Sequence, residues 1–600
     1  MSLPEVAPDV LADAVDSLPG RLRKRLDEFV TQAAGWPVAA DGTGGYVVTV
    51  DEQTTVTLAA VVRAAGDAAC TCLLAPRCLH RTAVLSAAPV LSAAPLFAGD
   101  ATDAGSTGAG VVAAAGLGDG TPADGAAAAP VVLDDAQVTA AGRLWRAAVP
   151  VLESGIPGSG AVAQAQLLRA VHEARGVGLH RAAAAGVRVV ESLRAARAED
   201  ARFRLADLTD DLRELLTVCH QLTSGAGDLA AARGTARREY EDLGSLRLSG
   251  LFAEPVLTTS GYAGAVTYLC DDDRRLWMVS SVRPGGVAEA RGAANGAVTL
   301  GEVRLSHRDA GRAGVVVVGA KASASGRLSG GARVRAVRAD GRAWTDEPLA
   351  GLWREPLAAQ LARYDAALAL PAPVRPAGHD LLFLRGTLGV GRDGLVITTA
   401  DAGVIAVAPA LADPALPTVT NLRQLARAAA GHEGLLIGRI AGTRVVHGLA
   451  LSADWLPDRL GGHVDLAVDA LDRSDLPGSA ADSVPDALAG PGSAQPIGTP
   501  PALHLLRMRV ERAVSGGRAA VRTPSGPDAA RLSAAQLATG AAVLAALHEA
   551  AAGRTRDVFG RLDPLDGDRL ARAWLTAAAY TDAASRHLAV AGWLAADRPG

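Results

Sequence analysis

The spacing of apolar side chains predicts helical stretches on either side of an extended middle. In residues 205–222, leucines recur every three or four positions, as on the buried face of a helix. Similar patterns predict helices within residues 1–35, 133–245 and 349–370. Near Leu246 the pattern changes to short runs of β-branched residues divided by turns, which is typical of strands. These strands are expected at 265–269, 276–280, 298–300, 314–318 and 334–337, and their close succession indicates an antiparallel sheet or barrel.

A second group of strands follows, and the chain then returns to helices. The second group is expected at 381–384, 395–398, 404–407 and 435–438, with a helix near 422–430. The C-terminal helices are expected at 503–514, 532–552, 570–579 and 583–595. Near the N-terminus, residues 46–50 and 55–58 predict two strands, and residues 81–88 predict a short helix.

Two stretches of Gly, Ala, Ser and Pro interrupt these patterns, at residues 99–132 and 475–501. Such a composition buries too little apolar area to offset the entropy of ordering, so both stretches are predicted to be flexible linkers. A chain of 600 residues is also too long for one hydrophobic core. We therefore predict an α+β multidomain protein. Its predicted parts are an N-terminal domain (1–98, core 46–90), a helical domain (133–245), a β-rich antiparallel body (246–474) and a C-terminal helical domain (502–600).

Composition and charge narrow the possible locations and partners. The N-terminus has no basic leader or apolar core of a signal peptide, and no stretch holds 18 uninterrupted apolar residues, so we expect a cytoplasmic protein without a membrane span. Residues 1–81 carry seven basic and ten acidic side chains. Nucleic-acid affinity depends largely on cations that neutralise phosphates, so this acidic balance lowers the DNA-binding hypothesis but leaves open a local patch at Arg77 and Arg81.

Three of the five cysteines lie within eleven residues, together with a histidine: Cys70, Cys72, Cys78 and His80. Alternate side chains of an extended segment share a face, so Cys70 and Cys72 can reach one ion, and Cys78 and His80 can do the same if they precede a helix and do not sit in its middle. Three thiolates and one imidazole form a closed tetrahedral zinc site. The spacing therefore predicts one structural Zn²⁺, with Pro76 in the turn between the two pairs.

Other interpretations of this cluster are weaker. A disulfide between Cys70 and Cys72 would be strained, and the three cysteines as simple buried side chains would leave His80 without a role. A catalytic zinc usually has three protein ligands and an open position for water, whereas four candidate ligands are present here.

The pattern Cys-x-Cys, a short spacer and Cys-x-His resembles that of the SWIM zinc finger family. The two predicted strands and the helix around it match the β-β-α unit of that family, although the five-residue spacer is at the short end of the family range. The wider arrangement is similar to the long SWIM proteins of high-GC actinobacteria. The resemblance implies contact with protein or DNA. The acidic balance favours a protein partner, and family analogy suggests a MoxR-type ATPase assembly.

Other candidate chemistry is sparse. The chain has no His-Glu-x-x-His motif, residues 386–391 fit a hairpin better than a phosphate loop, and Asp271–Asp273 fit an acidic turn better than a metal site. Cys219 lies on an apolar helical stripe and is expected in the core. The leading prediction is a non-catalytic zinc protein that mediates macromolecular interaction. The alternative is an enzyme whose site lies in the β-rich body, with the finger as a recruitment module.

Overall fold

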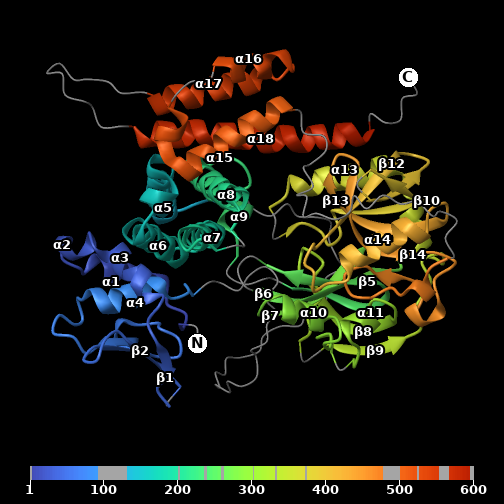
Figure 1. Ribbon diagram of the computed structural model, residues 1–600, viewed down its shortest axis with the longest axis horizontal. Coiled ribbons are helices and arrows are strands. Elements are labelled where there is room, and N and C mark those ends of the chain that lie inside the picture. Colours follow the sequence, from blue (N-terminus) through green and yellow to red (C-terminus); the bar gives the residue numbers. More distant parts are fainter. Residues whose placement is uncertain are drawn as a thin grey trace, which may run out of the picture.

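The computed structural model describes residues 3–42, 44–91, 132–200, 203–235, 240–258, 262–301, 303–331, 334–371, 374–392, 394–477, 501–522, 526–552 and 566–594. The two predicted linkers lie almost entirely outside these ranges. The fold is mixed α+β with antiparallel sheets, as predicted. Figure 1 shows helices on one side of the molecule, two β-sheets on the other, and the C-terminal helices lying across the helical side.

Residues 3–91 form the N-terminal unit, in which three helices precede a small sheet and a fourth helix follows it. The helices are α1 (Pro8–Asp16), α2 (Gly20–Arg23), α3 (Leu26–Ala33) and α4 (Leu79–Ala87). The strands are β1 (Val38–Ala40), β2 (Tyr46–Thr49), β3 (Thr55–Leu58) and β4 (Ala68–Cys70), paired antiparallel in that order. The β-β-α prediction was therefore incomplete. It missed β1 and β4 because each has only three residues, two of them alanine in both cases.

The helical block consists of α5 (Asp135–Gly158), α6 (Ala161–Gly176), α7 (His180–Arg197), α8 (Leu205–Ser224) and α9 (Leu229–Arg233). Asp134 caps α5, because its carboxylate accepts the Gln137 amide at 2.7 Å. Helix α1 of the N-terminal unit packs on α6. Buried side chains of the two regions belong to one continuous apolar cluster, so the N-terminal unit is anchored by more than its own small core.

The C-terminal helices join the same cluster. They are α15 (Pro501–Val521), α16 (Gly526–Ala534), α17 (Ala538–Ala552) and α18 (Gly567–Leu594). Helix α15 crosses α5 at Gly155 and Gly517, which have φ angles of 66° and 69°. A Cβ on Gly155 would lie 2.5 Å from the Gly517 nitrogen, so the close approach of these two kinks requires glycine. The helices predicted at 570–579 and 583–595 form one helix, α18, and the Thr581 hydroxyl in the predicted gap donates to the Ala577 carbonyl at 2.7 Å.

The first β-sheet is formed by β5 (Glu241–Leu257), β6 (Tyr262–Asp271), β7 (Leu276–Pro284), β8 (Gly314–Ala322) and β9 (Arg335–Ala339), in the order β7-β6-β5-β8-β9. Helices α10 (Val287–Ala293) and α11 (His307–Ala310) lie between the third and fourth strands. A parallel bridge between Met278 and Arg327 joins β7 to the segment that precedes β9. The strand predicted at 298–300 was wrong: Val298 and Leu300 are buried in the core of this sheet but lie in the connection between α10 and α11.

The second sheet repeats the same strand order. It contains β10 (Leu381–Gly391), β11 (Gly394–Thr399), β12 (Gly403–Pro409), β13 (Glu433–Gly442), β14 (Val445–Ser452) and the short β15 (Val464–Asp465). Helix α14 (Thr418–Ala428) again lies between the third and fourth strands, and a parallel pairing of β12 with β14 closes the barrel. The first five strands of the second sheet thus repeat the order of the first sheet, in which the single Met278–Arg327 bridge is the corresponding link. We call these two units the first and the second barrel.

The two barrels pack directly on each other. One apolar cluster contains side chains of both barrels: Leu251, Phe252 and Tyr268 of the first barrel, and Leu381 and Phe383 of the second barrel. Two short helices connect the barrels, α12 (Ala350–Arg354) and α13 (Leu357–Leu368). Partly buried ion pairs also cross the interface, including Arg439 with Glu254 at 2.6 Å and Arg312 with Asp465 at 3.2 Å. The second barrel thus covers part of the outer surface of the first barrel.

Candidate metal centre

Cys70 and Cys72 reach the centre from the end of the small sheet. Cys70 is the last residue of β4 and lies opposite Val56 of β3, which is fully buried. Directly paired residues in an antiparallel sheet share a face, so the Cys70 side chain lies on the covered face of the sheet. Thr71 continues the contact with β3, since its amide donates to the Thr55 carbonyl at 3.1 Å. Two residues beyond Cys70, Cys72 returns to the same side of the chain.

Cys78 and His80 reach the centre from the start of α4. Cys78 is the N-cap of this helix, and its sulfur accepts the Arg81 amide at 3.5 Å. His80 is the second residue of the helix, so it lies inside the first turn instead of before it. The loop between the two pairs turns at residues 73–76 and contains Pro76, as the sequence predicts.

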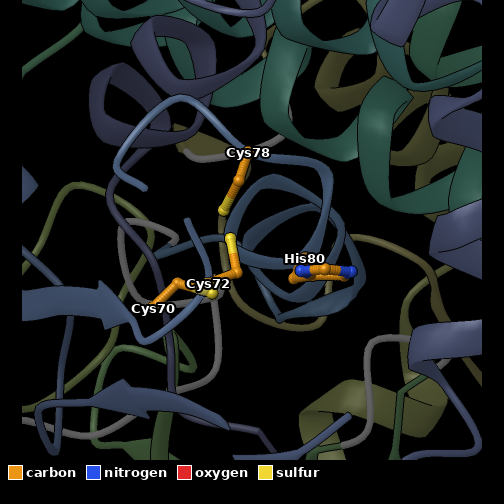
Figure 2. Close-up of side chains that lie close together, drawn as sticks. All are labelled: Cys70, Cys72, Cys78 and His80. Carbon is orange, nitrogen blue, oxygen red and sulfur yellow. The ribbon is translucent and has the colours of Figure 1, made fainter. Parts of the chain in front are cut away.

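The four side chains come together in space. One ligand atom from each of Cys70, Cys72, Cys78 and His80 can be chosen so that all four lie within 4.8 Å of one another. Figure 2 shows the sulfur atoms of Cys72 and Cys78 directed toward each other, with the Cys70 sulfur and the His80 ring beside them. In the described part of the chain, this is the one group of His, Cys, Asp and Glu side chains that can hold a metal ion.

The surroundings of these side chains fit a metal ion. His80 Nδ1 is buried and has no hydrogen-bond partner among the described residues, although buried imidazole nitrogens usually have one. The ring is held between Phe29 and Trp36, with centroid distances of 5.9 and 6.3 Å. All five cysteines are free thiols. A buried nitrogen without a partner, next to three free thiols, is the donor set that a thiolate-binding metal needs.

The pKa values of the ligand cysteines also indicate that a cation belongs at this site. Burial raises the pKa of the Cys78 thiol to about 12, and burial also raises the pKa of Cys70. Thiolates are therefore unfavourable here unless a cation compensates them. A bound divalent ion supplies that compensation and keeps coordinating thiols deprotonated.

Arg81 is a member of the site that the sequence did not reveal. Its side chain is buried, 4% exposed, and donates to the carbonyl oxygens of Ala68 at 2.8 Å and Ala65 at 2.9 Å. Burial lowers the pKa of Arg81, while the nearby Cys78 and Cys70 act in the opposite direction. A divalent ion held by three thiolates would carry a net charge of −1, which this guanidinium would balance. Because Arg81 is buried, it does not form a surface patch with Arg77.

The loop between the two ligand pairs exposes apolar side chains. Leu73 is fully exposed and Leu74 is 63% exposed, and these two are among the largest apolar side chains open to solvent in the described residues. Arg77 of the same loop is also exposed. This exposure could not be predicted from the sequence, because a leucine pair between two ligand pairs has the same pattern whether it is buried or exposed.

Other candidates agree with their predicted roles. Cys219 is fully buried in the apolar core. Asp271 accepts the Trp277 indole N–H at 2.8 Å, and Asp272 pairs with Arg342, so the acidic turn is occupied by protein partners. Residues 386–391 belong to the hairpin of β10 and β11.

Comparison of the chain with models of protein families, with curated proteins and with solved structures finds no match. Within the described residues, no helix is both long enough and apolar enough to cross a membrane.

Proposed function

We propose that the N-terminal unit is a SWIM-like zinc finger that holds one structural Zn²⁺ through Cys70, Cys72, Cys78 and His80 and that docks onto a protein partner. The observation that carries this proposal is the convergence of the four ligand atoms within 4.8 Å of one another. Three sulfurs and one imidazole favour Zn²⁺ over hard cations, which prefer oxygen ligands. Four protein ligands fill a tetrahedral shell, so the ion serves the structure of the loop and leaves no position for a substrate.

The exposed leucines support a protein partner. Leu73 and Leu74 project from a loop that a metal ion would hold at both ends, and Arg77 adds a positive charge beside them. Exposed apolar side chains gain nothing from contact with a phosphate backbone, whereas they gain free energy in an apolar pocket of a protein. The partner surface that fits is an apolar pocket with a carboxylate at its rim. A MoxR-type ATPase in the cytoplasm, where thiols stay reduced, is the first candidate.

Metal analysis tests the zinc proposal. Purified full-length protein is expected to contain one zinc ion per chain, and the Cys78→Ala variant is expected to lose it. Cys219→Ala is the matched control, because this thiol is also buried but lies in the helical core. Absence of zinc from the unmodified protein, or full zinc content in Cys78→Ala, would contradict the proposal.

A binding comparison tests the partner class. The double variant Leu73→Ser, Leu74→Ser is expected to retain zinc and to weaken binding to a purified MoxR-type ATPase at least tenfold. Val337→Ser is the control, since Val337 is 64% exposed on β9, far along the chain from the loop. Tight binding of the unmodified protein to duplex DNA, with steep salt dependence and no effect of the leucine changes, would favour DNA as the partner instead.

A further inference from the structure

A cleft of about 680 Å³ opens where the two barrels and their connecting helices meet. It lies between the turn that joins β6 to β7, the end of α12, the first half of α13 and the start of β10. Clefts of 300–1,000 Å³ are the usual size of small-molecule sites. It is separate from the metal centre, and its residues belong to the β-rich body.

The charge of this cleft is strongly one-sided. Four arginines line it, Arg274, Arg275, Arg354 and Arg363, against a single carboxylate, Glu355. Glu355 is already paired with Arg363 at 2.5 Å. Arg274 and Arg275 form no ion pair with any described residue. Two aspartates of the same turn bond other side chains, since Asp271 accepts the Trp277 indole N–H and Asp272 pairs with Arg342.

Two of these arginines are held in place before any ligand arrives. The Arg275 guanidinium lies over the Trp277 ring, 4.2 Å from its centroid. Arg274 has a φ of 64°, a left-handed conformation that non-glycine residues rarely adopt. Its side chain lies against α12, because a Cβ built on Gly351 would be 2.7 Å from Arg274 Cδ and Nη1. Side chains fixed in this way lose little entropy when they bind an anion.

Arg363 adds an unused donor to the opposite wall. Its Nη1 bonds Glu355 and its Nη2 bonds the Leu381 carbonyl at 3.1 Å. Its Nε is buried and has no hydrogen-bond partner among the described residues. A buried guanidinium N–H without a partner is costly, and an anionic oxygen would satisfy it.

The remaining walls are apolar. Phe383, Leu276 and Leu352 line the cleft together with two prolines. A cleft that is lined by both guanidinium groups and apolar side chains selects a ligand that has both an anionic group and an apolar or aromatic body. A doubly charged phosphate matches several guanidinium groups better than a single carboxylate does, because each group can donate two parallel hydrogen bonds.

We propose that this cleft binds a phosphorylated small molecule with an aromatic or apolar body, through Arg274 and Arg275 on one wall and through Arg363 and Phe383 on the other. The site gives the β-rich body a ligand-binding role that is independent of the zinc finger.

Calorimetric titration of the full-length protein at low salt tests this site. The probes are inorganic phosphate, phenyl phosphate, adenosine monophosphate and unphosphorylated adenosine. Saturable binding of phenyl phosphate or adenosine monophosphate is expected, at least tenfold tighter than binding of phosphate or adenosine.

Matched variants assign any binding to the cleft. Arg275→Ala and Arg274→Gly are each expected to weaken binding at least tenfold, and glycine accepts the left-handed backbone at position 274. Arg338→Ala removes an exposed arginine of β9 and is expected to have no effect. Failure of every phosphorylated probe to bind, equal affinity for adenosine and its monophosphate, or an equal loss in Arg338→Ala would overturn the proposal. Thermal melts of the variants confirm that each is folded.

Discussion

Removal of the metal ion is expected to release the ligand loop without unfolding the helices behind it. The loop of residues 71–78 has few contacts of its own: its internal backbone bond joins the Ala75 amide to the Cys72 carbonyl at 3.0 Å, and Leu73 and Leu74 are exposed. Ordering eight residues costs about 8–16 kcal/mol, at about 1–2 kcal/mol each. A structural zinc ion supplies about 10–16 kcal/mol, so the ordered loop depends on the ion.

The neighbouring helices have a different source of stability. Helix α4 buries Val84 and Leu85 completely, and burial of each such side chain contributes about 1.5–3 kcal/mol. Helix α1 packs on α6 and shares the large apolar cluster of the helical block. These contacts do not involve the metal. We therefore expect local release of the loop and of the first turn of α4, with the rest of the N-terminal unit still docked.

Hydrogen exchange measured by mass spectrometry can separate these regions. After chelation, or in Cys78→Ser, peptides that cover residues 68–82 are expected to exchange roughly 100-fold faster, which corresponds to about 3 kcal/mol of lost protection. The exchange rates of peptides from α7 are expected to stay unchanged. In the control variant Cys219→Ala, residues 68–82 are expected to exchange as slowly as in the unmodified protein. Unchanged protection of 68–82 without metal would refute the reasoning, as would loss of protection throughout the helical block.

Three further predictions concern buried charged groups. Arg81→Leu removes the donor to the carbonyls of buried Ala68 and exposed Ala65 and the cation beside the ligands, so we expect about 1–3 kcal/mol lower stability in urea and weaker zinc retention against a chelator. Asp469→Asn removes the buried carboxylate that contacts Arg308 at 2.5 Å and Arg312 at 2.7 Å, although Arg312 keeps Asp465 as a partner, and urea unfolding is expected to show a loss of about 3 kcal/mol. Burial raises the pKa of Glu191 to about 7 from the ordinary 4.5. Between these two pH values the native state keeps a proton that the unfolded chain releases. The free energy of unfolding therefore falls as pH rises from 4.5 through 7. Glu191→Gln is therefore expected to be more stable than the unmodified protein at pH 8, by about 1–3 kcal/mol, but not at pH 4.5; equal stability at pH 8 would contradict this account.

Much of the secondary structure followed from local patterns. The strands near 265–269 and 381–384 and the helix over 205–222 lie where the spacing of apolar residues predicted them. The predictions of secondary structure failed where a segment with a strand-like pattern has a different position in the folded protein. Residues 298–300 are apolar because they fill the core of the first barrel, and they look like a strand although no neighbouring strand pairs with them.

The long strand β5 illustrates the opposite failure. Its first residues are mostly exposed and polar, and Gly244 and Gly250 interrupt it, so only the general change of pattern near Leu246 was visible in the sequence. In the folded chain it pairs with both β6 and β8 and forms the centre of the sheet. Hydrogen bonds to two neighbours outweigh its poor strand propensity.

The sequence by itself determined which residues can act as metal ligands, because the reach of a Cys-x-Cys strand end and of a Cys-x-His helix start is fixed by local geometry. It also determined the α+β class, since hydrophobic period is a local property. Tertiary structure alone decided the rest. The buried position of Arg81, the exposure of Leu73 and Leu74, and the arginine-lined cleft between Arg274 and Arg363 all depend on segments distant in the chain. Packing brings such segments together, and no spacing along the chain encodes which side chains then face protein and which face water.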